Sequence, residues 1–264
     1  MDRLEKTKRL RMSQADPKKD IALINQQSLK ELSPEDVYCY NVNLCDNDVD
    51  RDLDRFPDAS LRTLAEMFVG KPGITDHRWS AEKQHSRIYR AEVVSGDGQT
   101  ILGEPLKQLR ASAYMLRNEQ NQPLIDAIEG GIVKEVSVGF RIKKRVCSLC
   151  GEPLHYDWRF GVEKCANDHI KGESYDNGTC VGNMVEPTEA YEFSFVAVPS
   201  QRKAGVTKGA GDDLDGAFDC LMEADLSNHG AQIRELMPRM QMALTTADER
   251  AKRDAIRKYA EENF

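Results

Sequence analysis

Residues 128–140 read Ile128-Glu129-Gly130-Gly131-Ile132-Val133-Lys134-Glu135-Val136-Ser137-Val138-Gly139-Phe140. Apolar and polar side chains alternate over much of residues 132–145, which predicts a half-buried β-strand. Val136, Val138 and Phe140 share the face that would point into a core. Ser137 therefore points to the opposite face, beside a glycine that leaves room for another chain.

Helical and strand-like segments flank this stretch. One helix should be capped by Asp58 and end before Gly70, and a second, shorter helix should run from Pro123 to Gly130. The run of alternating aspartates over residues 50–55 reads as a solvated loop. Many strands with few helices predict an α+β fold. The further strands are expected over residues 36–44, 87–94, 109–116 and 191–198.

Composition excludes several classes of protein. The 264 residues carry 37 Lys and Arg against 44 Asp and Glu, a net charge of −7, which argues against a general nucleic-acid binder. No apolar run approaches the ~20 residues that a membrane span needs. The basic N-terminus is followed by no apolar segment, so it does not read as a secretory signal.

Charge and glycine content divide the chain into parts. Residues 1–32 are expected to form a flexible charged arm, and residues 33–205 a single main domain. A linker that begins at Gly205 should lead into a helical tail over residues 206–264. This tail is too short to bury a core of its own, so we expect it to act through a partner such as a scaffold helix.

Four cysteines crowd into residues 147–180, inside an expected insertion over residues 146–183. The pattern C-x2-C-x14-C-x3-H provides soft and borderline ligands at a spacing suited to tetrahedral Zn²⁺. A closed set of four ligands predicts a structural ion, because no position is left for a substrate. Cys180 and His155 compete for the fourth position. The predicted ligands are Cys147, Cys150, Cys165 and His169.

The sequence contains no nucleophile-elbow, phosphate-loop, zinc-protease or dinucleotide fingerprint. Two features remain as candidates for catalysis: Ser137 in the predicted strand, and His77 at the end of a Gly- and Pro-containing loop. A serine becomes a nucleophile when a base lies beside it, and histidine is the usual base. His85 is not expected to take part.

The order of these motifs resembles that of the prohead (capsid maturation) proteases of tailed phages, over residues 35–208. The segments that carry the resemblance are FVGKPGITDH at 68–77, ASAYML at 111–116, IEGGIVKEVSVGF at 128–140, EFSFVAVP at 192–199 and AGVTK at 204–208. The resemblance implies a herpesvirus assemblin-like fold, which is a small, mostly antiparallel β-barrel wrapped by helices.

The resemblance also implies the roles of residues. Ser137 would be the nucleophile, His77 the general base and Glu192 the acidic third member, with Glu92 and Glu189 as alternatives to Glu192. Backbone N–H groups of residues 201–203 are the candidates for an oxyanion hole.

The function expected from these features is a serine endopeptidase that acts inside the assembling procapsid in the host cytoplasm. Its substrates would be the major capsid protein, the scaffold protein and itself. The resemblance makes a homodimer an expectation, whereas nucleic acid and membrane are not expected partners. The alternative is a catalytically inactive capsid-assembly or scaffold protein on a protease-like fold.

Overall fold

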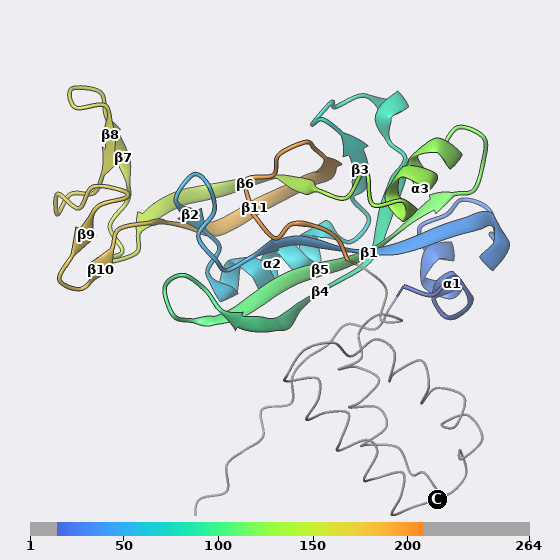
Figure 1. The fold of residues 1–264 in the computed structure, drawn as a ribbon, viewed down its shortest axis with the longest axis horizontal. Helices are drawn as coiled ribbons and strands as arrows, with labels where there is room; N and C mark the ends of the chain where they lie inside the picture. The colour runs from blue at the N-terminus through green and yellow to red at the C-terminus, as the bar shows by residue number, and fades with distance from the viewer. Residues whose placement is uncertain (1–14, 208–264) are drawn as a thin grey trace, which may run out of the picture. The chain divides into compact units, whose positions relative to one another are not determined.

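A computed structural model describes residues 15–207 of the chain (Figure 1). The predicted α+β class is confirmed, since the described residues are mostly in strands with three α-helices. The helices are α1 (Pro17–Asn25), α2 (Asp58–Phe68) and α3 (Gln122–Glu129). The strands are β1 (Val37–Asp46), β2 (Asp54–Arg55), β3 (Pro72–Thr75), β4 (Ser86–Gln99), β5 (Pro105–Leu116), β6 (Val136–Cys147), β7 (His155–Asp157), β8 (Val162–Lys164), β9 (Ser174–Tyr175), β10 (Gly178–Thr179), β11 (Gly182–Phe195) and β12 (Gly205–Thr207).

One eight-stranded sheet forms the body of the described chain. Its order is β12-β1-β5-β4-β3-β11-β2, and β6 pairs with the other edge of β11. All neighbours are antiparallel except β11, which runs parallel to β3 at one end and to β2 at the other. Beyond the far ends of β6 and β11, the small hairpins β7–β8 and β9–β10 project away from the sheet (Figure 1).

The sheet does not close into the barrel that we expected. Only one isolated bridge, between Glu135 and Gly205, links the segment before β6 to β12. The Val206 N–H donates to the Lys134 carbonyl there, at 2.7 Å. Beyond this bridge, no ladder pairs β1 or β12 with β6 among residues 15–207.

The core lies between the sheet and α2. The helix buries Leu61, Leu64 and Phe68 against β4, β5 and β11, at the i, i+3 and i+7 positions of one face. Pro57, and not Asp58, occupies the N-cap position. Asp58 is the first helical residue and forms an ion pair with Lys107, so it still places a negative charge at the positive end of the helix.

The expected flexible arm over residues 1–32 is wrong for residues 15–32. Asp16 caps α1 by accepting from the Lys18 N–H, and Ile24 is fully buried. The Tyr89 hydroxyl on β4 donates to Asp20 at 2.7 Å, which ties the helix to the sheet. Apolar residues on one helix face therefore make this segment fold against the sheet, although its charge content is high. Residues 1–14 lie outside the described residues.

Two strand boundaries also differ from expectation. β6 begins at Val136 and not at residue 132, because Gly131 takes a left-handed conformation (φ 71°) and the chain turns there, leaving Ile132 exposed. β11 begins at Gly182, nine residues before the expected strand, and it continues past a register shift near Pro187. Because a proline inside a run argues against a strand, the sequence pattern did not predict the first half of β11.

Gly205 belongs to the sheet and not to a linker. A Cβ on this residue would meet the Lys134 carbonyl oxygen at 2.8 Å, so only glycine allows the two segments to approach. The helical tail predicted beyond β12 lies outside the described residues.

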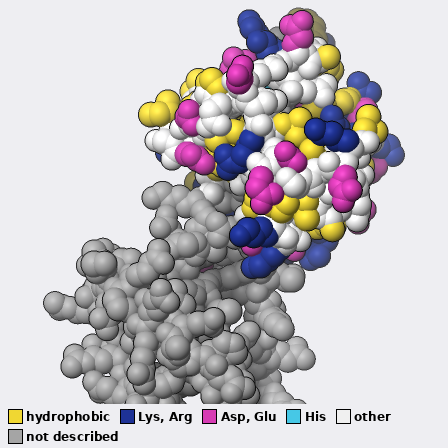
Figure 2. Space-filling model, turned by 90° about the vertical axis from the view of Figure 1, so that its right-hand side faces the viewer, with side chains coloured by type: hydrophobic (Ala, Val, Ile, Leu, Met, Phe, Trp, Pro, Cys, Tyr) yellow, Lys and Arg dark blue, Asp and Glu magenta, His cyan; other side chains and the backbone are white. Residues whose placement is uncertain are grey.

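Within residues 15–207, no helix has the length and apolar character to cross a membrane. The face of this unit that Figure 2 shows carries Lys, Arg, Asp and Glu intermingled, with small apolar areas between them. No single sign of charge dominates this face.

The substitution Gly205→Ala should destabilise the protein by about 1–3 kcal/mol, because the added methyl overlaps a backbone atom that cannot move freely. Urea unfolding of the full chain measures this change. A flexible linker would respond in the opposite way, with no change or a gain of a few tenths of a kcal/mol. Unchanged or increased stability would thus contradict the role of Gly205 in the sheet.

Candidate functional site

The candidate site is built on the antiparallel pair β6 and β11. The register sets Glu192 opposite Gly139 and Ser194 opposite Ser137. Residues directly opposite each other in such a pair lie about 4.5–5.5 Å apart and point to the same face of the sheet. Glu192, Ser194 and Ser137 therefore share one face, and the phenylalanines of β11 occupy the other face, in the core.

A strained turn after β3 presents His77 to this face. Asp76 and His77 both take left-handed backbone conformations (φ 53° and 52°), which non-glycine residues rarely adopt. Two bonds to β11 hold the turn: the Asp76 N–H donates to the Phe195 carbonyl at 3.0 Å, and the His77 N–H donates to the Ser194 hydroxyl at 2.8 Å. The backbone of His77 is thereby anchored to Ser194, the residue that lies opposite Ser137 in the register.

The structure brings His77 and Glu192 into contact. His77 Nδ1 lies 2.8 Å from Glu192 Oε1, and the Glu192 side chain is 3% exposed against 42% for His77. Burial raises the pKa of the Glu192 carboxyl, and the hydrogen bond from His77 opposes that rise. With Nδ1 engaged by the carboxylate, Nε2 remains to accept a proton.

Gly139 is the residue that makes room for this contact. A Cβ at Gly139 would lie 2.3 Å from Glu192 Oε1, so the carboxylate passes directly over the β6 backbone. We expected the glycine beside Ser137 to leave room for another chain. The space above Gly139 is instead occupied by the Glu192 side chain. Because His77 is bonded to this same oxygen, its imidazole lies over β6, two residues from Ser137.

No hydrogen bond joins Ser137 to His77 among the described residues. Catalytic hydrogen bonds are often long in the absence of substrate. Of the alternative carboxylates, Glu92 lies on β4 opposite Arg110, and Glu189 lies opposite Arg141. Neither contacts His77 within residues 15–207. His85 is half-buried and contacts the Ser86 hydroxyl at 3.1 Å, away from the pair.

An open pocket of about 530 Å³ lies beside the His77–Glu192 pair. Exposed Trp79 and half-buried Tyr191 form an aromatic wall, with ring centroids 5.1 Å apart, and Arg141 lies over the Tyr191 ring. No pattern in the sequence predicts this wall, since its aromatic residues are single and come from separate segments.

A second pocket, of about 190 Å³, is lined by Ser137 where β1 and β6 stay unpaired. Asp50, Asp52 and Asp54 also line it. The expectation of a solvated loop is wrong for Asp50 and Asp54, which are 6% and 7% exposed. The loop turns inward because Asp50 accepts from the N–H groups of Asp52 and Asp54, both at 2.9 Å. Burial raises the pKa of the Asp50 carboxyl to about 6.

The loop after β11 completes this second pocket. Gln201 is buried and lines the pocket together with Ser200. The N–H groups of Gln201, Arg202 and Lys203 donate to no other residue in the described range. They are therefore available as donors, and Gln201 lines the same pocket as Ser137. Their role as an oxyanion hole stays a prediction.

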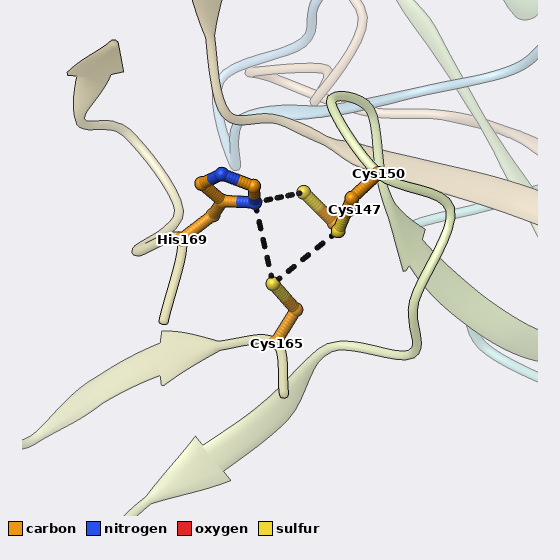
Figure 3. A group of neighbouring side chains, drawn as sticks. All are labelled: Cys147, Cys150, Cys165 and His169. Carbon is orange, nitrogen blue, oxygen red and sulfur yellow. Dashed lines mark hydrogen bonds between the residues drawn. The ribbon is translucent and has the colours of Figure 1, made fainter. Parts of the chain in front are cut away.

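The predicted metal ligands also meet in space (Figure 3). The ligand atoms of Cys147, Cys150, Cys165 and His169 all lie within 4.8 Å of one another. His169 Nδ1 lies 3.6 Å from Cys147 Sγ and 3.5 Å from Cys165 Sγ, and the sulfurs of Cys150 and Cys165 are 3.5 Å apart. The group can hold one metal ion.

The two competing ligands lie outside this group. Cys180 Sγ is 3.5 Å from Cys147 Sγ but is not among the four mutually close atoms. His155 is exposed on β7. Hydrogen bonding from the Glu152 backbone lowers the pKa of the Cys150 thiol to about 6, and the thiolate is the form that binds metals.

Comparison with known proteins gave no match: no protein-family model, no curated protein and no solved structure is similar to the chain.

The substitution Asp50→Asn should stabilise the protein at pH 7 by about 1–3 kcal/mol. Asparagine keeps the Oδ1 acceptor for both N–H groups and removes a buried charge. Because the pKa of Asp50 rises on folding from 3.8 to about 6, its charge costs the native state stability as pH rises through that window. The advantage of asparagine should therefore disappear near pH 4.

Urea unfolding of the full-length parent and variant at pH 7 and pH 4 measures this difference. Glu119→Gln removes an exposed carboxylate without a contact in the described range and serves as the control. A variant that is less stable than the parent at pH 7 would contradict the assignment of a buried, unfavourable charge.

Proposed function

We propose that this protein is a serine endopeptidase of the prohead protease type, with an assemblin-like arrangement of its strands. The observation that carries the proposal is the buried Glu192 carboxylate bonded to His77 Nδ1, on the sheet face that Ser137 shares. A carboxylate that fixes the tautomer of a histidine beside a serine is the arrangement that activates a serine nucleophile.

The proposed mechanism assigns a role to each residue. His77 Nε2 takes the proton from Ser137 as its Oγ attacks the scissile carbonyl, and then gives that proton to the leaving amine. Glu192 holds the imidazole and stabilises the imidazolium. Backbone N–H groups of residues 201–203 stabilise the oxyanion. Water then hydrolyses the acyl-enzyme by the same proton transfers in reverse.

The biological setting follows from the resemblance of the motifs. The proposed substrates are extensions of the major capsid and scaffold proteins and the enzyme's own chain. The proposed place of action is the assembling procapsid in the host cytoplasm, with a homodimer as the proposed active form. Confinement would restrict proteolysis to the stage at which the shell is assembled.

A second candidate is an inactive assembly protein on the same fold. The observation that favours it is the lack of a hydrogen bond between Ser137 and His77 within the described chain. The two candidates differ in one measurable property, which is the reactivity of Ser137.

In purified full-length protein, the parent should shorten itself, whereas Ser137→Ala should accumulate at full length. His77→Ala should match Ser137→Ala, because members of a triad act as a unit. The expected loss of rate is about 10³-fold or more. Mass spectrometry of timed samples measures the cleavage, and a fluorophosphonate probe should label the parent at Ser137.

Two matched controls separate chemistry from folding. Ser95→Ala and His155→Ala change exposed residues of the same types and should shorten themselves as the parent does. If the parent and Ser137→Ala shorten equally, or if the parent cleaves neither itself nor its capsid protein, the protease proposal fails and the assembly protein remains.

We also propose that the metal is a structural Zn²⁺. Bond lengths of about 2.3 Å to sulfur and 2.0–2.1 Å to nitrogen place tetrahedral ligands roughly 3.8 Å apart for two sulfurs and roughly 3.5 Å apart for sulfur and nitrogen. Three contacts within this group, Cys147–His169, Cys165–His169 and Cys150–Cys165, agree with these values to within about 0.3 Å. Zinc would hold together an insertion with a very small apolar cluster of its own.

Metal analysis of the purified protein should give one zinc per chain. His169→Ala should lose most of that zinc, and Cys180→Ser should keep it, because only the first change removes a member of the close group. Cys39→Ser changes a cysteine on β1 and serves as the control. Zinc well below one per chain in the parent would overturn the proposal, and loss of zinc in Cys180→Ser alone would reverse the assignment of the fourth ligand.

A further inference from the structure

The pocket beside Ser137 differs in character from the open pocket beside His77. Its floor is apolar, with Leu44, Phe56 and Met184, and its wall holds Asp50, Asp52 and Asp54. We call this site the Asp pocket. Pockets for drug-sized ligands span roughly 300–1,000 Å³, so a volume of about 190 Å³ suits one long side chain.

Two of the three carboxylates in the Asp pocket have no cationic partner. Asp54 is ion-paired with Arg145 at 3.0 Å and with Lys171 at 2.7 Å. Within residues 15–207, by contrast, no Lys or Arg forms an ion pair with Asp50 or Asp52. A buried carboxylate without a partner is unfavourable to the fold, which indicates that something other than folding requires it.

Gln201 adds an independent sign of a ligand. Its side chain is 6% exposed and lines the Asp pocket. Oε1 accepts from the Asp46 N–H at 3.3 Å, whereas Nε2 has no hydrogen-bond partner. A buried donor without a partner is rare in proteins, and this one belongs to a residue of the pocket lining.

The arrangement of the carboxylates does not suit a metal ion. Among the described residues, only the Cys and His group has three or more ligand atoms within 4.8 Å of one another. Carboxylates that are spread along an apolar-floored pocket suit a cation at the end of an aliphatic stem, because such a stem packs on apolar surface while its charged end stays at the polar wall.

We propose that the Asp pocket selects substrates with a lysine or arginine next to the bond that Ser137 cleaves. The aliphatic stem lies on Leu44 and Phe56, and the cationic end pairs with Asp50 and Asp52. Gln201 Nε2 donates to a carbonyl of the bound peptide. This proposal rests on the proposed function, because the pocket can select substrates only if Ser137, which lines it, cleaves them.

Peptidyl diphenyl phosphonates that differ only in the residue next to phosphorus test the proposal. Ser137 Oγ forms the bond to phosphorus, phenoxide leaves, and the serine proton passes to His77. The lysine probe should label the full-length protein about 10- to 100-fold faster than the norleucine probe, which is the range that a charge-assisted hydrogen bond gives. A glutamate probe should be slower still.

Charge-removing variants connect the preference to the pocket. The double change Asp50→Asn and Asp52→Asn should reduce the lysine-to-norleucine ratio to about one. Asp52→Asn alone changes an exposed side chain without a described contact, so it should fold and show part of the loss. Glu119→Gln should keep the full preference.

The outcomes separate this proposal from the protease proposal. Equal labelling by the lysine and norleucine probes, with Ser137 still labelled by a fluorophosphonate, overturns the specificity and leaves the protease standing. A lysine preference that survives in the double variant also overturns it. If no probe labels Ser137 in the parent, both proposals fail.

Discussion

The candidate site depends on one close approach: the Glu192 carboxylate crossing over Gly139 in the pair β6 and β11. A side chain at position 139 would occupy the place of Glu192 Oε1, and the bond to His77 Nδ1 would be lost. The β6–β11 register sets Ser137 and Glu192 on one face of the sheet. The parallel pairing of β11 with β3 then delivers the strained turn that carries His77 to the same face.

The incomplete closure of the sheet has a structural consequence beside Ser137. Because β12 reaches the start of β6 with a single bridge, the space between β1 and β6 is not filled by a ladder. The loops that follow β1 and β11 fill it instead, and they are joined by the Arg51 Nε bond to the Pro199 carbonyl at 3.0 Å. Buried aspartates and Gln201 enter the pocket on these loops. Natural proteins accept such unfavourable groups mainly where function needs them.

The metal group and the candidate nucleophile are separate sites that one strand, β6, connects. β6 ends at Cys147, a metal-ligand candidate, and carries Ser137 ten residues earlier. The ion pairs of Asp54 with Arg145 and Lys171 connect the insertion to the loop of the Asp pocket. Lys171 of the insertion therefore holds Asp54, a residue of the pocket lining, in place.

Local patterns were enough to predict much of this protein. The helix at residues 58–68, most strands, the α+β class and the four close metal-ligand candidates follow from spacing along the chain, because they involve neighbouring residues. The contact of His77 with Glu192 was foreseen only through the resemblance of motifs. The packed helix α1, the first half of β11, the open sheet and the buried aspartates were missed or predicted wrongly. Each of these four features depends on contacts between segments that are distant in the sequence. Whether a residue is buried also depends on those contacts. Spacing along the chain was sufficient to assign most elements and the chemical groups. That His77, Glu192 and Ser137 share one face followed from the fold, since three strands far apart in the chain had to pair in one register.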